Sequence, residues 1–78
     1  MTDTFLDLTD MIKNDIIYAL TDLYFDVGIL DEDFDYIVLE INSFKDDIEE
    51  ITSVIEYYGG KVWQPQYNGE AWIIEVEV

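Results

Sequence analysis

The strongest topological signal in the chain is 61-KVWQPQYNGEAWIIEVEV-78, in which two apolar runs flank Asn68-Gly69. Asn-Gly is the dipeptide most typical of a two-residue type I′ turn, so we predict a β-hairpin of residues 61–67 and 70–78. This turn would pair Tyr67 with Glu70 and Trp63 with Ile74. One face of the hairpin would then carry the bulky apolar side chains Trp63, Trp72, Ile74 and Val76.

Pro65 indicates where each hairpin strand lies in the sheet. Because proline has no backbone N–H to donate to a neighbouring strand, residues 61–67 are predicted at a sheet edge. The last strand is more apolar and is therefore predicted in the centre of the sheet.

Two helices and one further strand are predicted upstream of the hairpin. Residues 34–42 alternate as a strand with Ile37, Leu39 and Ile41 on one face. One helix is predicted from Thr4 to about residue 25, and Gly28 with the acidic residues 31–33 is predicted to form the following loop. A second helix is predicted over residues 44–58, with Ser43 as its N-cap and Asp46 as the partner in a capping box, and with Gly59-Gly60 at its end. Its apolar stripe consists of Phe44, Ile48, Ile51, Ile55 and Tyr58.

These elements predict a single α+β domain over residues 1–78, in the order α-β-α-β-β. A crossover through the second helix would bring both helices onto one face of a three-stranded sheet. The result would be a two-layer α/β sandwich with a C-terminal hairpin. Most of the aromatic side chains are expected in its core.

The charge of the chain is extreme. Its 19 acidic residues face only three lysines, with no arginine or histidine, and give a formal net charge of −16 over 78 residues. Half of the residues are hydrophobic, so the chain should fold and carry the carboxylates outside. Such a surface repels nucleic acids and anionic membranes, so the expected partner is a basic protein, a cation or another copy of the chain. With no signal peptide or membrane span in evidence, the predicted location is the cytoplasm.

The sequence contains few of the residue types that catalysis or metal binding usually requires. The chain has no cysteine and no histidine, which excludes a thiol or imidazole nucleophile system, and we predict that it is not an enzyme. Residues 31–35 (DEDFD) open like a calcium loop, but Tyr36 stands where the sixth position needs glycine and Asn42 where a bidentate glutamate belongs. No metal and no cofactor are predicted.

The size, the charge, the missing arginine, histidine and cysteine, and the spread of acids over both helices resemble a functional class. The chain is similar to the small acidic DNA-mimic inhibitors of phages and mobile elements, including anti-CRISPR and anti-restriction proteins. The resemblance implies an inhibitor that occupies the basic groove of a CRISPR effector, a restriction enzyme or another nucleic-acid-processing protein, in the host cytoplasm if a phage encodes it. The predicted partner-binding residues are Asp7, Asp10, Asp15, Asp22, Asp31, Glu32, Asp33, Asp46, Asp47, Glu49, Glu50, Glu56 and Tyr57.

Other interpretations remain open at this point. The non-helical face of the sheet would carry apolar side chains such as Val38, Val62 and Ile73, which suits a structural or adaptor protein that forms a homodimer through that face. Acidity would then serve solubility alone. A halophilic protein and an acidic antitoxin are two further possibilities.

Overall fold

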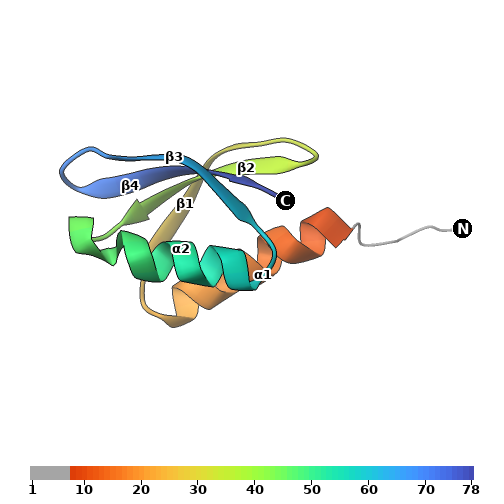
Figure 1. Ribbon diagram of the computed structural model, residues 1–78, viewed down its shortest axis with the longest axis horizontal. Helices are drawn as coiled ribbons and strands as arrows, with labels where there is room; N and C mark the ends of the chain where they lie inside the picture. The colour runs from red at the N-terminus through yellow and green to blue at the C-terminus, as the bar shows by residue number, and fades with distance from the viewer. Residues whose placement is uncertain (1–7) are drawn as a thin grey trace, which may run out of the picture.

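The computed structural model describes residues 8–78 and has the element order α-β-β-α-β-β. Both helices lie on the same face of the sheet (Figure 1). The predicted α+β class is confirmed, but the prediction of three strands is wrong, because the described residues form a four-stranded antiparallel sheet. The elements are α1 (Leu8–Asp22), β1 (Asp26–Glu32), β2 (Tyr36–Asn42), the 3-10 turn η1 (Lys45–Asp47), α2 (Ile48–Tyr57), β3 (Lys61–Tyr67) and β4 (Ala71–Glu77).

The missed strand is β1, which occupies the region predicted as a loop. It pairs antiparallel with β2, from Asp26 opposite Asn42 to Glu32 opposite Ile37, with an irregularity between Ile29 and Asp31. Glycine and aspartate are rare in strands, and Val27 is the only residue of β1 that is not largely exposed. The strand therefore has almost no buried alternating face from which it could be predicted.

The strand order is β1-β2-β4-β3. The last strand lies between β2 and β3 and β3 lies at an edge, as the position of Pro65 predicts. Since β4 is antiparallel to both of its neighbours, β2 and β3 run in the same direction on either side of it.

The register of the C-terminal hairpin differs from the prediction. Asn68, Gly69 and Glu70 all lie outside the strands, and Tyr67 pairs with Trp72 instead of Glu70. The Asn68 side chain accepts hydrogen bonds at 2.9 Å from the backbone N–H groups of Glu70 and Ala71, which stabilises this longer loop.

A second irregularity separates Trp63 from Gln66, where Gln64 adopts a φ of 44° before Pro65. Trp63 therefore pairs with Glu75 on the open face of the sheet, and Val62 turns toward the helices opposite Val76. The prediction placed these two side chains on the opposite faces.

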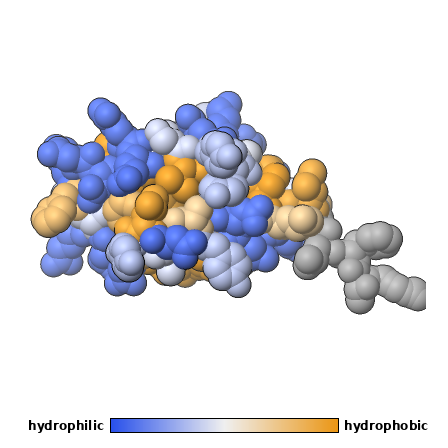
Figure 2. Space-filling model, turned by 90° about the horizontal axis from the view of Figure 1, so that it is seen from below, coloured by the Kyte–Doolittle hydropathy of each residue, from blue (hydrophilic) through white to orange (hydrophobic). Residues whose placement is uncertain are grey.

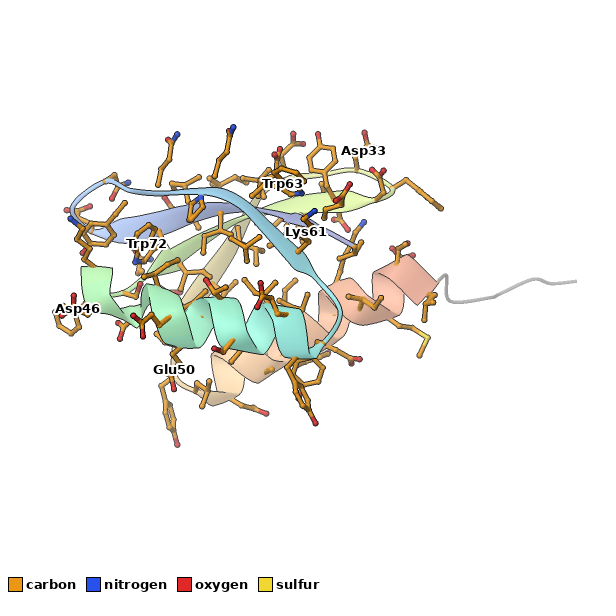
Figure 3. All side chains as sticks on the ribbon, viewed as in Figure 1. Asp33, Asp46, Glu50, Lys61, Trp63 and Trp72 are labelled. Atoms are coloured by element: carbon orange, nitrogen blue, oxygen red, sulfur yellow. The ribbon has the colours of Figure 1, made fainter. Side chains whose placement is uncertain are left out.

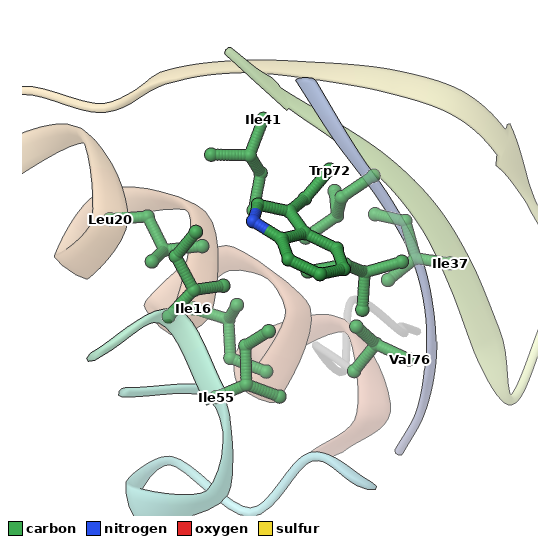
Figure 4. Packing of buried hydrophobic residues seen from close by; sticks show 10 residues of the cluster. Ile16, Leu20, Ile37, Ile41, Ile55, Trp72 and Val76 are labelled. Atoms are coloured by element: carbon green, nitrogen blue, oxygen red, sulfur yellow. The ribbon is translucent and has the colours of Figure 1, made fainter. Parts of the chain in front are cut away.

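The core is aliphatic, with one indole in its middle (Figure 4). The predicted inner face of β2 is confirmed, since Ile37, Leu39 and Ile41 are at most 1% exposed. Trp72 donates its indole N–H to the carbonyl oxygen of Lys45 at 3.1 Å, which ties the start of α2 to the sheet. The helices contribute Ile16, Leu20, Ile51 and Ile55, all fully buried.

The helix ends follow the prediction in part. The predicted start at Thr4 lies outside the described residues. The predicted capping box lies one residue later and belongs to η1, where the Asp47 carboxylate accepts a hydrogen bond from the N–H of Phe44 at 2.9 Å. The helix α2 itself begins at Ile48 and not at residue 44 as predicted. Gly59 has a φ of 100° and ends α2 as predicted.

Candidate functional site

Two of the three lysines are engaged within the chain. Lys13 is only 3% exposed, and its ammonium group donates to the carbonyl oxygen of Asp33 and lies 3.4 Å from Glu32 Oε2 and 3.9 Å from Asp10 Oδ1. The ammonium group of Lys61 lies 4.6 Å from the ring centroid of Trp63, in cation–π contact. The outer surface therefore keeps very little free positive charge.

Five of the predicted residues line the start and the outer side of α2. We call this set the acidic ridge: Asp46, Asp47, Glu49, Glu50 and Glu56. Four of them are exposed, while Asp47 is half-buried and holds the N–H of Phe44. At a rise of about 1.5 Å per residue, the ridge extends over roughly 15 Å. One strand of a DNA duplex presents about four phosphates over that length, at about 3.4 Å per nucleotide.

The predicted loop acids occupy the end of β1 and the following turn. Asp31 and Glu32 are strand residues, and only Asp33 lies in the turn that connects β1 to β2. Lys13 brings Glu32 together with Asp10 of α1, so these two carboxylates are partly neutralised.

The remaining predicted acids belong to α1. Asp7 lies outside the described residues. Asp15 and Asp22 are exposed, and Asp22 meets the predicted aromatic residue Tyr57 in a shared hollow.

This hollow, which we call the tyrosine groove, lies between the last turn of α1 and the second half of α2. It has a volume of about 370 Å³. Its lining includes Ala19, Asp22, Leu23, Val54, Tyr57 and Tyr58.

The predicted acids do not form one continuous patch. Asp46 and Glu50 lie toward the start of α2, whereas Asp33 lies at the opposite end of the molecule, in the turn between β1 and β2 (Figure 3). A partner that contacted all of these acids would have to surround the molecule. We therefore treat each acidic face as a separate candidate interface.

The site prediction left out most of a further acidic surface on the open face of the sheet and named only its Asp31. Strand pairing places side chains of all four strands on this face, and its carboxylates are Asp26, Asp31, Glu40, Glu75 and Glu77. The alternation of apolar and polar residues along β2 and β4 could have predicted that Glu40, Glu75 and Glu77 lie on this face. Asp26 could be placed there only once β1 was recognised as a strand. Homodimerisation through this face stays a prediction, but it would bring like charges together.

The phenol of Tyr36 reports on this negative field. Its hydroxyl donates to Asp31 Oδ2 at 3.3 Å. The negative charge of Asp31, followed by partial burial and the charges of Asp33 and Glu75, raises the pKa of Tyr36 above its ordinary value. Beside it lies a hollow of about 280 Å³ bordered by Asp35, Trp63, Glu75 and Glu77.

The aromatic side chains contradict the expectation that most of them lie in the core. Tyr57 is 81% exposed and Phe44 also 81%, while Trp72 is the one buried aromatic residue in the described part of the chain. Seen from the helix side, apolar side chains interrupt an otherwise hydrophilic surface (Figure 2). The core is filled by aliphatic residues, so the rings remain available for contacts. Other exposed aromatic residues are Tyr18, Tyr24, Phe34, Tyr58 and Trp63.

Comparison with known proteins adds no family. No protein-family model matches the chain, and no curated protein matches it significantly. Across residues 8–78 there is no group of three or more acidic, histidine or cysteine side chains arranged to hold a metal ion. Neither described helix is long and apolar enough to cross a membrane.

Proposed function

We propose that this protein is an inhibitor that binds the basic nucleic-acid-binding groove of a host defence or nucleic-acid-processing protein, such as a CRISPR effector or a restriction enzyme. It would act in the cytoplasm by presenting carboxylates where the target expects phosphates. It would contact neither nucleic acid nor membrane and would catalyse no reaction.

The acidic ridge is the observation that carries the proposal. Its five carboxylates extend over about the length of four to five nucleotides of one DNA strand. An ordinary solvated helix intersperses lysines among such acids at three- and four-residue spacing, whereas α2 (Ile48–Tyr57) contains none. The one lysine within the described stretch 45–57 is Lys45 of η1, four residues before Glu49. The field of the remaining acids would speed the encounter with a basic target, and salt would weaken it.

The first test is affinity capture from a bacterial lysate at low salt, followed by elution with duplex DNA and then with high salt. A nucleic-acid-binding protein released by the DNA, and blocked from its own DNA by this chain, is the expected result. Recovery of only the bait, or of proteins that DNA does not displace, would overturn the proposal.

Two matched variants then locate the interface. One neutralises four ridge acids (Asp46→Asn, Glu49→Gln, Glu50→Gln, Glu56→Gln), and the other neutralises four acids of the open sheet face (Asp26→Asn, Glu40→Gln, Glu75→Gln, Glu77→Gln). Both lose the same charge, so long-range steering changes equally. The ridge variant should lose at least tenfold more affinity for the captured target, mainly through faster dissociation. Equal losses would mean that only the overall charge matters and would contradict the role of the ridge.

A further inference from the structure

We propose that the tyrosine groove is the anchoring site for an arginine side chain of the basic partner. The inference deepens the proposed function, since it names the contact that would fix the inhibitor on its target. It rests on that function for the nature of the partner, and on the groove itself for the chemistry.

The groove combines an apolar floor with aromatic walls. Ala19, Leu23 and Val54 offer aliphatic surface to the methylene stem of a long side chain. Tyr57 and Tyr58 pack edge to face, with ring centroids 4.9 Å apart and an interplanar angle of 82°. Because Tyr57 stays 81% exposed in this arrangement, its ring remains open to a partner.

The electrostatics of the groove favour a cation. It lies between the C-terminal halves of both helices, where the helix dipoles place partial negative charge. Helices commonly compensate this charge with a basic residue, but the last turns of α1 and α2 contain none. Asp22 and Glu56 stand in these turns and add full negative charges.

These features select arginine over other occupants. A planar guanidinium group can stack on a tyrosine ring while it pairs with a carboxylate such as Asp22, which a lysine ammonium group does less well. A second copy of the chain is a poor occupant, because it has no arginine and carries the same large negative charge. The occupant is therefore a basic partner of a different kind.

The test uses the full chain and needs no identified target. Acetylated and amidated tetra-arginine is titrated into isotopically labelled protein at low salt, with tetra-lysine as the probe of equal charge. The largest chemical-shift changes should fall on Leu23, Val54 and Tyr57, and tetra-arginine should bind about threefold more tightly than tetra-lysine. Shifts that centre on the acidic ridge instead would overturn the proposal.

Exposed residues outside the groove provide matched controls. Tyr57→Ala should weaken tetra-arginine binding about fivefold, whereas Tyr18→Ala, which removes a ring of α1 that is 70% exposed, should change it less than twofold. Asp22→Asn should weaken binding more than Asp15→Asn, which removes the same charge from the same helix. Equal effects within either pair would refute the assignment.

Failure of the groove and failure of the proposed function give different results. If the peptide binds in the groove but no nucleic-acid-binding protein is captured, the inhibitor proposal is wrong and the arginine site stands. If a captured target binds Tyr57→Ala as tightly as the parent protein, the site is wrong and the inhibitor proposal stands.

Discussion

Gly60 is the position where a single added methyl group should damage this fold most. It joins α2 to β3 and is itself buried. A Cβ atom built there would lie 2.8 Å from Ile55 Cγ2, 2.8 Å from Val76 Cγ1 and 2.9 Å from Ile16 Cδ1. Carbon atoms pack at about 3.5–4.0 Å, so three methyl groups would each have to move by more than about half an ångström. All three side chains are fully buried and have no free space in which to move.

The expected cost of Gly60→Ala is about 2 kcal/mol of unfolding free energy. Overpacking of this kind costs about 1–3 kcal/mol, and the reduced freedom of the unfolded chain offsets about 0.5 kcal/mol of it. For a domain of this size the melting temperature should fall by roughly 8–15 °C. Thermal and urea unfolding, followed by far-UV circular dichroism, measure both quantities.

Gly28→Ala is the matched control, because its Cβ would meet only the carbonyl oxygen of Glu40, at 3.9 Å. It should leave stability unchanged or raise it by about 0.5 kcal/mol. Adding Val76→Ala to Gly60→Ala removes one of the clashing methyl groups, so the double variant should lose less stability than the sum of the two single variants. The reasoning fails if Gly60→Ala is as stable as Gly28→Ala, or if the two substitutions are additive.

Three further predictions concern charge. Added sodium chloride should raise the melting temperature, because it screens repulsion among the carboxylates, and a fall between low and moderate salt would contradict this explanation. Lys13→Ala should cost about 1–3 kcal/mol in urea unfolding, since it removes a buried stem and leaves Asp10 and Glu32 without their cation, while the exposed Lys45→Ala should cost less than about 0.5 kcal/mol. Tyr36 should ionise above its ordinary pKa of 10.0, mainly because of Asp31, so the folded state holds this proton more tightly than the unfolded chain. The stability that Tyr36 contributes should therefore be complete below pH 10 and be lost as the pH rises through the pKa of the folded state. An absorbance titration with Tyr36→Phe as the reference measures this pKa. Ionisation of Tyr36 at its ordinary value would contradict the prediction.

The parts of the fold that the sequence predicts correctly are those where burial follows a regular period. Ile37, Leu39 and Ile41 alternate because one face of β2 is completely buried, and Ile51 and Ile55 recur because one side of α2 packs on the sheet. Nothing comparable marks β1, whose main stabilisation is backbone pairing with β2, and backbone pairing leaves no trace in side-chain hydropathy.

The register error in the hairpin has a local cause. Asn68-Gly69 predicts a tight turn, but the Asn68 side chain reaches two N–H groups only in the longer loop. The longer loop shifts the pairing by two residues, which leaves each side chain on its predicted face, whereas the irregularity between Trp63 and Gln66 shifts it by one and moves Trp63 to the other face. The burial of Lys13 could not be predicted from the sequence either. Its ammonium group contacts Asp10 of α1, Glu32 of β1 and Asp33 of the following turn, which come together only in the folded chain.

The composition of the candidate surface is readable from the sequence, but its grouping is not. Net charge alone favours a basic partner, whereas the tyrosine groove exists only because α1 and α2 pack side by side. Which carboxylates act together depends on that packing.

The two edge strands of the sheet, β1 and β3, differ in how they could pair with a strand of another molecule. On β3, Pro65 and the irregular backbone at Gln64 interrupt the row of hydrogen-bonding groups that an incoming strand would need. The free edge of β1 is likewise interrupted once, between Ile29 and Asp31, and its acids Asp26, Asp31 and Glu32 discourage another copy of the same chain. Open-ended fibrils need two complementary edges on every subunit. This chain should therefore resist polymerisation even at high protein concentration.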